Sequence, residues 1–271
     1  MLVGVQDIKS LQDWYDKIIH GDAFEVMPQI PDGIADTVFW DPPYYLQISG
    51  KNKLKRWKAG TEIHGVNDDW DKFSSFEEYD LFVSKALENI KRIMKSNGTI
   101  WVIGTYHNIH RIGKIMQDMG FWILNDVIWL KTNPMPNWLG VRFTNAIETI
   151  IWAVKDKEVK KYYFDKSKAV EYTKHVTAPC VFQLPICTGS ERIKDDNGIK
   201  VHSTQKPEAL LERIISVSTP VNGLVFDPMA GTGTTAAVAK KINRHFLVVE
   251  KDEKYIQVIK HRLEQLNRAI L

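Results

Sequence analysis

The chain has 271 residues, is 44% hydrophobic and 25% charged, and carries a formal net charge of +3, which fits a soluble globular protein with a substantial core. No apolar run approaches the roughly 20 residues needed to span a bilayer, and the amino-terminal residues are too charged for a secretory signal, so we expect no membrane partner. The chain has 2 cysteines, Cys180 and Cys187, without metal-ligand spacing, so we expect a reducing, cytoplasmic setting and no metal site.

Hydrophobic periodicity predicts strands that alternate with helices along the chain. Strands are expected at Thr37–Trp40, Thr99–Gly104, Ile123–Leu130, Ile147–Val154, Leu224–Asp227 and Phe246–Glu250. Helices are expected at Phe76–Met94, about His110 to Met119, Pro207–Val217, Thr232–Lys241 and Glu253–Leu266. Ser75 and Glu78 form a predicted capping box before the first of these helices, and Asn97-Gly98 is typical of its end. The alternation predicts an α/β fold, a doubly wound and mainly parallel sheet with helices on both faces.

An acid, two prolines and a tyrosine follow the first expected strand, as Asp41-Pro42-Pro43-Tyr44. Open α/β sheets bind their ligands at the carboxyl ends of strands, which is where Asp41 is expected. The prolines fix φ and remove two backbone donors, so we expect a stiff loop whose carbonyl groups face outward beside an aromatic ring. These residues alone leave open an ordinary proline turn at the end of a strand.

A second loop with binding character follows the expected strand Leu224–Asp227. Gly231 and Gly233 allow the backbone to turn tightly into a helix, and such a strand, glycine loop and helix bind nucleotide-like ligands. The loop lacks the Gly-Lys-Ser/Thr of a phosphate-binding P-loop. Glu250 ends the next expected strand, where an acid suits the hydroxyl groups of a ribose. Together these features favour an adenosyl cofactor without the phosphates of a dinucleotide.

Two further regions have the composition of a binding surface. A basic run follows the Asp41 loop and consists of Lys51, Lys53, Lys55, Arg56 and Lys58, with Trp57 inside it. It is typical of phosphate-backbone contacts, although a solvated loop would have the same composition. The region from Thr132 to Lys200 is irregular, aromatic and basic, with Ile147–Val154 as its one clearly periodic strand, and long irregular segments of this kind usually carry function.

Taken together, the two loops resemble those of a known family. Asp41-Pro42-Pro43-Tyr44 with Asp227-Pro228-Met229-Ala230-Gly231-Thr232-Gly233 is similar to the S-adenosylmethionine-dependent amino-methyltransferases of DNA, in the chain order of their permuted β-class. His202–Ile215 resembles the element that precedes the glycine loop in that class, and Ile18–Met27 resembles the segment that lies against the cofactor adenine. Trp101–Ala153 is similar to the GANTC-methylating adenine enzymes.

The sequence departs from that group in three places. Ser203 stands where proline is usual, and Ile147 stands where histidine is usual. Several members carry a C-terminal DNA-binding extension, whereas this sequence stops at Leu271. These departures bear on the recognition sequence more than on the chemistry, and they leave open an adenine methyltransferase with another short recognition site.

The resemblance implies a Rossmann-like class I methyltransferase fold, circularly permuted and interrupted by a target-recognition region. The implied division is a catalytic half at 1–131, a recognition insert at 132–200 with one core strand near 147–154, and a cofactor-binding half at 201–271. The implied reaction moves a methyl group from S-adenosylmethionine to the N6 amino group of a flipped-out adenine, with GANTC as the expected site. Double-stranded DNA, a second copy of the chain and a cognate restriction endonuclease are the implied partners.

The resemblance also implies roles for individual residues. Asp41 and the Pro42 carbonyl would accept the two N–H bonds of the adenine amino group, Pro43 would stiffen the loop, and Tyr44 would stack on the base. The expected cofactor-binding residues are Asp22, Ala23, Asp41, Ser203, Thr204, Lys206, Asp227, Pro228, Ala230, Gly231, Gly233, Thr234, Glu250 and Lys251. The expected DNA-binding residues are Lys51, Lys53, Lys55, Arg56, Lys58, Asn133, Asn137 and Arg142, because amines suit phosphates whereas Asn and Arg suit base edges.

Three alternatives compete with this interpretation. Pro179-Cys180 is the dipeptide that cytosine-C5 methyltransferases use for covalent attack, but Cys180 lies far upstream of the glycine loop instead of soon after it. An N4-cytosine enzyme would use the same geometry, although that group more often has serine in place of Asp41. A DNA-binding module with a decayed cofactor site is disfavoured by the intact loops.

His107 and His110 could share a helix face, but no third metal ligand accompanies them.

Overall fold

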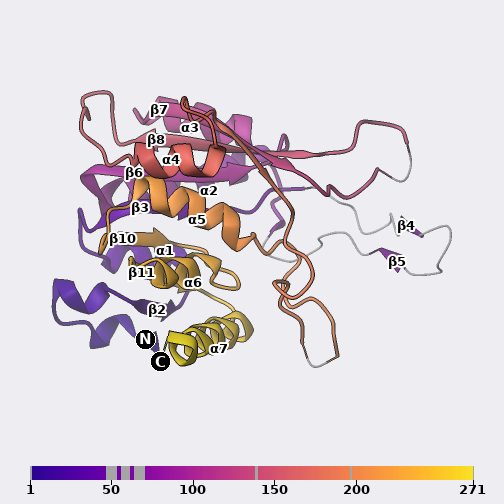
Figure 1. Cartoon of the computed structure of the whole chain (residues 1–271). Helices are drawn as coiled ribbons and strands as arrows, with labels where there is room; N and C mark the ends of the chain where they lie inside the picture. Colours follow the sequence, from indigo (N-terminus) through magenta and orange to yellow (C-terminus); the bar gives the residue numbers. More distant parts are fainter. Residues whose placement is uncertain are drawn as a thin grey trace.

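A computed structural model of the chain describes residues 2–46, 54–55, 62–63, 71–137, 140–195 and 197–270. Among these residues, nine strands form one sheet in the order β1-β2-β11-β10-β3-β6-β8-β7-β9 (Figure 1). Its strands are β1 (Leu2–Val3), β2 (Lys17–His20), β3 (Ala35–Trp40), β6 (Met94–Gly104), β7 (Trp122–Lys131), β8 (Ile147–Val154), β9 (Val181–Leu184), β10 (Leu224–Asp227) and β11 (His245–Glu250). Neighbouring strands pair in parallel except at β8, which is antiparallel to both β6 and β7. A separate antiparallel pair joins β4 (Leu54–Lys55) and β5 (Glu62–Ile63).

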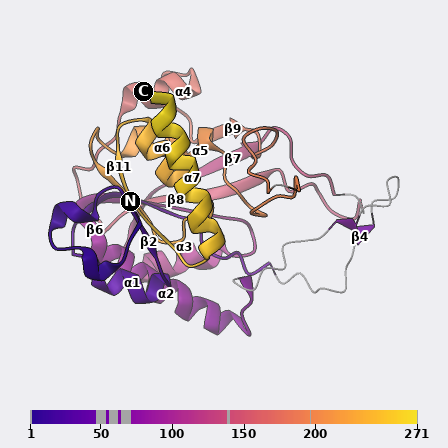
Figure 2. The same cartoon turned by 90° about the horizontal axis from the view of Figure 1, so that it is seen from below.

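Helices cover both faces of the large sheet (Figures 1 and 2). One face packs against α1 (Ala23–Val26), α2 (Phe76–Ile93) and α3 (Ile109–Asp118). The other face packs against α4 (Lys166–Thr173), α5 (Glu208–Ser218), α6 (Thr234–Lys241) and α7 (Glu253–Ile270). The expectation of a mainly parallel α/β sheet between two helical layers is therefore confirmed.

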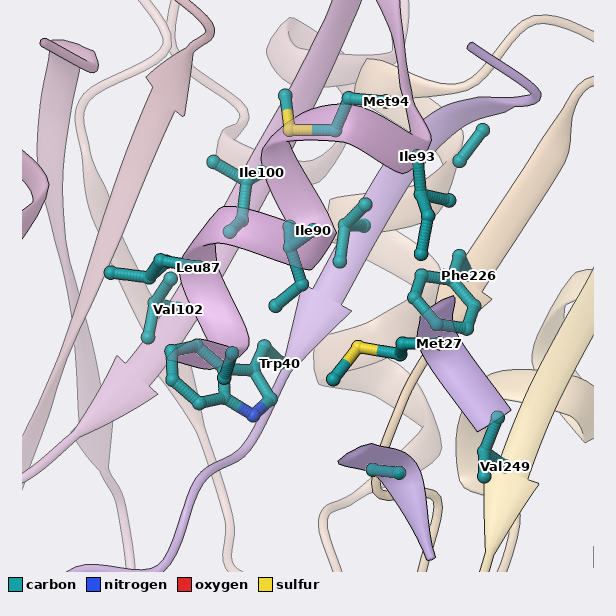
Figure 3. Packing of buried hydrophobic residues seen from close by; sticks show 14 of the residues in the cluster. Met27, Trp40, Leu87, Ile90, Ile93, Met94, Ile100, Val102, Phe226 and Val249 are labelled. Atoms are coloured by element: carbon teal, nitrogen blue, oxygen red, sulfur yellow. The ribbon is translucent and has the colours of Figure 1, made fainter. Parts of the chain in front are cut away.

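The central strands are apolar along their length because both of their faces are buried. In β3, Val38 and Trp40 point toward α2 and belong to one buried cluster, whereas Phe39 points to the opposite face and belongs to the other. Figure 3 shows Trp40 packed beside Leu87 of α2 and Val102 of β6. This two-sided packing fixes the strands whose carboxyl ends carry the site.

Some boundaries differ from those the sequence predicts. Helix α2 ends at Ile93, so the expectation that Asn97-Gly98 ends it is wrong: both residues lie inside β6, since Met94 already pairs with Ala35 of β3. The expected capping box is half formed. The Ser75 hydroxyl accepts from the Glu78 N–H at 3.2 Å, but the Glu78 carboxylate accepts from the N–H of Ser74. Pro207 precedes α5 as its N-cap residue, and α6 begins at Thr234, after the glycine loop.

The described helices include none that is long and apolar enough to cross a membrane. The same part of the chain contains no group of three or more His, Cys, Asp or Glu side chains that could hold a metal ion. His107 instead packs its ring against that of Tyr106, with 4.0 Å between the ring centroids.

Candidate active site

Three acids lie at one edge of the sheet because they follow three adjacent parallel strands. Asp41 comes directly after β3, Asp227 is the last residue of β10, and Glu250 is the last residue of β11. The neighbouring strand β2 leads into Gly21, whose N–H donates to the Glu250 carbonyl oxygen at 3.0 Å. The parallel order thus gathers residues that are more than 200 positions apart in the sequence.

A cavity of about 520 Å³ opens at this edge. Its wall includes the expected site residues Asp22, Ala23, Asp41, Pro42, Pro43, Tyr44, Thr204, Lys206, Asp227, Pro228, Ala230, Gly231, Thr234, Glu250 and Lys251. Two expected residues, Ser203 and Gly233, are not part of the wall. Ser203 is exposed, and Gly233 is the N-cap residue of α6. Phe24, Phe82 and Tyr255 contribute apolar surface that the sequence did not single out.

Asp41 and Lys206 form an ion pair in the cavity wall. The Lys206 Nζ lies 2.6 Å from Asp41 Oδ2, and the lysine side chain is 7% exposed. Burial raises the pKa of the Asp41 carboxyl above its usual value, and the nearby Lys206 cation opposes that rise. The second carboxylate oxygen, Oδ1, is buried and has no hydrogen-bond partner among the described residues. A carboxylate of the cavity wall therefore has one oxygen atom without a donor among the described residues.

Tyr79 of α2 and Asn108, the residue before α3, hold the loop after Asp41 in place. The Tyr79 hydroxyl donates to the Pro43 carbonyl oxygen at 2.7 Å, and the Asn108 side-chain amide donates to the Tyr79 hydroxyl oxygen at 3.1 Å. The expectation that both proline carbonyls face outward is thus wrong for Pro43, because a buried carbonyl needs a donor and α2 supplies one. The Pro42 carbonyl oxygen accepts no hydrogen bond from the described residues.

Tyr44 is 7% exposed and lies between two charged groups. Its hydroxyl donates to Glu148 Oε2 at 2.8 Å, and the Lys206 Nζ lies 5.1 Å from the centre of its ring. Burial raises the pKa of Tyr44 well above its ordinary value, and the neighbouring carboxylates of Asp41 and Glu148 add to that rise. The hydroxyl is therefore held in its protonated, donating form.

Asp71 holds the chain just beyond Tyr44. Its two carboxylate oxygens accept from the N–H groups of Tyr45 at 2.7 Å and Leu46 at 2.9 Å. Tyr45 has a φ of 51°, a backbone conformation that residues other than glycine rarely adopt. The contact with Asp71 therefore stabilises an unfavourable backbone conformation. No local pattern in the sequence links Asp71 to a loop 26 positions away, so the sequence does not predict this contact.

The glycine loop is built around Asp227 and two glycines with positive φ. Asp227 accepts from the Met229 N–H at 3.0 Å and from the Thr235 hydroxyl at 2.5 Å, and burial raises its pKa to about 7. Gly231 has a φ of 53° and Gly233 a φ of 71°. A Cβ atom at Gly233 would lie 2.7 Å from Ile259 Cγ1, so α7 leaves no room for a side chain there.

Glu250 and Asp22 form the far end of the cavity. Glu250 accepts from the N–H groups of Gly231, Lys251 and Asp252 at 2.7, 2.8 and 2.8 Å. Burial nevertheless raises the pKa of Glu250 above its ordinary value. Asp22 caps α1 and pairs with the Lys251 ammonium group at 3.0 Å. A carboxylate ending β11 beside a glycine turn has the chemistry of a ribose site.

The expected DNA-binding residues fall into two groups. Lys51, Lys53, Arg56 and Lys58 lie outside the described residues, and of Lys55 only the backbone in β4 is described. Asn133, Asn137 and Arg142 lie in the connection between β7 and β8, at the same end of the sheet as the cavity (Figures 1 and 2). Asn133 Oδ1 accepts from the Ile186 N–H, Asn137 donates to the Arg142 carbonyl oxygen, and the Arg142 guanidinium donates to the Tyr106 hydroxyl.

The region 132–200 contains more of the core than the sequence predicts. Besides β8, it contributes α4 and the edge strand β9, which pairs in parallel with β7. Cys180 is exposed and its carbonyl oxygen accepts from the Ile128 N–H next to β9. It does not line the cavity.

Comparison with known proteins connects this geometry to DNA modification. A family described as DNA methylase matches residues 35–261. The chain is 48% identical over 258 residues to the type II methyltransferase M.HinfI of Haemophilus influenzae, a match covering 95% of this chain and 71% of that protein. The M1.HpyAVI–SAM complex superposes with a TM-score of 0.62 at 25% identity, covering 91% of this chain and 98% of that one. The cytosine-N4-specific PvuII DNA methyltransferase superposes with a TM-score of 0.69 at 20% identity, covering 90% and 85%.

Proposed function

Because the chain belongs to the family of DNA methylases, we propose that it transfers a methyl group from S-adenosylmethionine to the N6 amino group of an adenine in duplex DNA. The observation that carries this proposal is Asp41 Oδ1, a buried acceptor in the cavity wall without a donor among the described residues. Leaving such an atom unpaired costs about 1–3 kcal/mol. The N–H of an amino group on a base would supply the missing donor.

The proposed mechanism follows from the positions of the acceptors. An adenine amino group is a poor nucleophile because its lone pair is delocalised into the ring. The Asp41 carboxylate and the Pro42 carbonyl accept its two N–H bonds and favour a pyramidal nitrogen, an interaction that strengthens toward the transition state. Tyr44 stacks on the base, which has to leave the duplex to enter the cavity. A strong base is unnecessary, because methylation makes the departing proton acidic.

The cavity fits the proposed cofactor in size and in chemistry. S-adenosylmethionine supplies an electrophilic methyl group when it is bound. Glu250 would hold the ribose hydroxyl groups, Asp22 and Ala23 would border the adenine, and Thr204 or Lys206 would meet the methionine carboxylate. The complex of M1.HpyAVI with SAM, at 25% identity over 91% of this chain, supports this assignment.

The proposed recognition site is GANTC, and the similarity of Trp101–Ala153 to the GANTC-methylating adenine enzymes supports it. In this proposal the fold is a permuted one, with a catalytic half at 1–131, a recognition insert at 132–200 that includes one core strand near 147–154, and a cofactor-binding half at 201–271. Asn133, Asn137 and Arg142 would read bases, and the basic run from Lys51 to Lys58 would contact phosphates. A homodimer in the cytoplasm, acting beside a cognate restriction endonuclease, completes the proposal and rests on the resemblance to the β-class.

Radiolabelled S-adenosylmethionine tests the reaction directly. The purified protein is incubated with two duplex oligonucleotides that share their composition, one containing GANTC and one with that site scrambled, and the nucleosides are then separated. We expect labelled N6-methyladenine from the first duplex alone. Labelled N4-methylcytosine or 5-methylcytosine would contradict the proposed base, and equal labelling of both duplexes would contradict the proposed site.

A further inference from the structure

The reversed strand β8 brings a buried carboxylate to the edge of the sheet where the site lies. Glu148 is the second residue of β8, and β8 runs antiparallel to its neighbours, so its amino end meets the carboxyl ends of β6 and β7. The proposed mechanism leaves Glu148 without a role. It is 8% exposed, and a carboxylate in such a position is costly unless both of its oxygen atoms are paired.

Both oxygen atoms of Glu148 are paired, and each partner comes from a different element. The Tyr44 hydroxyl donates to Oε2 at 2.8 Å, and the Lys131 ammonium group lies 2.8 Å from Oε1. Lys131 is the last residue of β7, its side chain is 12% exposed, and its Nζ lies 5.4 Å from the centre of the Trp129 ring. Tyr44, Glu148 and Lys131 therefore form a triad of linked side chains, which runs from the site along this edge of the sheet to the end of β7.

This triad restricts the orientation of the Tyr44 ring. The ring is attached at one end to the rigid loop whose Pro43 carbonyl accepts from Tyr79, and at the other end its hydroxyl is held by Glu148. Holding the hydroxyl oxygen fixes the direction of the ring axis, which rotation about χ1 would otherwise change, and therefore fixes where the ring lies. A fixed ring axis matters for a group that stacks on a base, because stacking depends on the relative position and orientation of the two rings.

We propose that Glu148 and Lys131 are positioning residues that hold the Tyr44 ring in the place required to stack on the target base. The inference rests on the proposed function and deepens it. Glu148 acts as the acceptor for the Tyr44 hydroxyl, and Lys131 compensates the buried charge of Glu148. Neither residue contacts the cofactor cavity, since neither belongs to its wall.

A double-mutant cycle distinguishes positioning from a general contribution to folding. Tyr44→Phe removes the hydroxyl donor and keeps the ring, and Glu148→Leu removes the acceptor. We expect each variant to lower kcat on a GANTC duplex by on the order of 10- to 100-fold, because small displacements at a reacting group have effects of this size. The double variant is expected to be no slower than the slower single variant. Multiplicative losses would contradict the proposal, because Glu148 would then act independently of the Tyr44 hydroxyl.

Charge rescue gives a second test that does not need the Leu variant to fold. Lys131→Met alone leaves the buried Glu148 without its cation, so we expect activity to fall. Adding Glu148→Gln to Lys131→Met removes the unpaired charge but keeps an oxygen acceptor for the Tyr44 hydroxyl, so most of the activity is expected to return. A double variant as slow as Lys131→Met would overturn the role of Lys131 in compensating Glu148.

The control is a second ion pair in the same sheet, the partly exposed Lys95 and Asp36, whose charged atoms lie 2.7 Å apart at the amino ends of β3 and β6. Lys95→Met is expected to lower thermal stability without changing kcat.

The fluorescence of 2-aminopurine placed at the target adenine reports how the extruded base is held. We expect its quenching to weaken in Tyr44→Phe and Glu148→Leu and not in Lys95→Met. If the wild-type protein transfers no methyl group, the proposed function is wrong. If the wild-type protein is active and the Glu148 variants keep its kcat, the positioning role alone is wrong.

Discussion

The Lys206 ammonium group lies 2.6 Å from the Asp41 carboxylate, and these residues are 165 positions apart in the sequence. The pair joins the loop after β3 to the segment before α5, so the two halves of the cavity are connected at the place where the base and the cofactor are proposed to meet. Burial raises the pKa of Asp41 while Lys206 lowers it. The cation therefore favours the ionised form of a buried carboxyl.

This pair predicts how activity depends on pH. Ionised Asp41 is the acceptor in the proposed reaction, so activity should be lost as pH falls through the pKa of Asp41. Lys206→Met removes the cation that lowers this pKa, so the acid limb of the kcat/KM profile should move to higher pH, whereas Lys206→Arg should move it less. The profile is measured at saturating S-adenosylmethionine, so that weaker cofactor binding does not contribute. An unshifted acid limb in Lys206→Met would contradict the proposed role of Asp41.

Asp227 predicts how stability depends on pH. Burial raises its pKa from 3.8 to about 7 in the folded chain, so between these values the folded state binds more protons than the unfolded state. The free energy of unfolding contributed by this group therefore falls as pH rises from about 4 to 7, by roughly 4 kcal/mol in total. Asp227→Asn removes this dependence.

We expect Asp227→Asn to be more stable than wild type at pH 8, with a difference that shrinks toward pH 5. Urea unfolding of both proteins at pH 5, 6, 7 and 8 measures the difference directly. A difference that is constant across this range would show that Asp227 does not titrate there.

Glu250 predicts a loss of cofactor affinity. Its carboxylate ends β11 at the far end of the cavity, where it is proposed to hold the ribose hydroxyl groups. Hydrogen bonds to a charged group contribute about 1.5–3 kcal/mol, so Glu250→Ala should weaken S-adenosylmethionine binding by roughly 10- to 100-fold. Titration calorimetry measures the change, and Glu253→Ala, an exposed acid in the first turn of α7, is the matched control. Equal affinities for wild type and Glu250→Ala would contradict the ribose role.

Replacing Gly233 by alanine is expected to lower stability for two reasons, an unfavourable backbone conformation and a packing clash, and a control variant separates them. Its φ of 71° disfavours any side chain by roughly 1–2 kcal/mol, and a Cβ atom would also meet Ile259 at 2.7 Å, which adds roughly 1–3 kcal/mol. Gly189 is the matched control, since its φ is 62° and a Cβ atom there would meet nothing within 4 Å. Thermal unfolding should show Gly233→Ala to be the less stable variant, and equal losses would show that α7 yields to the added methyl group.

The sequence predicts the two loops of the site because each depends on local order. A buried strand followed by an acid, or by glycines, determines where Asp41 and Asp227 lie once the strands are parallel. The edge of the sheet then brings the two loops together without any further information. The same local rules predict most of the helices, although α2 ends earlier than its glycine suggests because β6 begins directly after it.

The contacts that support the site could not be predicted in this way. Tyr44 meets Glu148, and Glu148 meets Lys131, only because of the order of the strands and the reversal of β8, which a pattern of hydrophobic residues does not encode. Asp71 meets the Asp41 loop from 26 positions along the sequence, a contact that no local pattern indicates. A charged residue at a solvated surface position would have the same appearance in the sequence as any of the three. Their burial and their partners are properties of the tertiary structure.

The central claim is that the Asp41 loop directs methyl transfer to the N6 amino group of adenine in a short DNA site. Single-molecule sequencing of genomic DNA tests it most directly, in bacterial cells that lack adenine methylation and express either the wild-type chain or Asp41→Ala. We predict N6-methyladenine throughout GANTC sites with the wild-type chain and none with Asp41→Ala, although the variant should still bind S-adenosylmethionine in calorimetry. Methylated cytosine in place of methylated adenine, or undiminished adenine methylation by Asp41→Ala, would contradict the account.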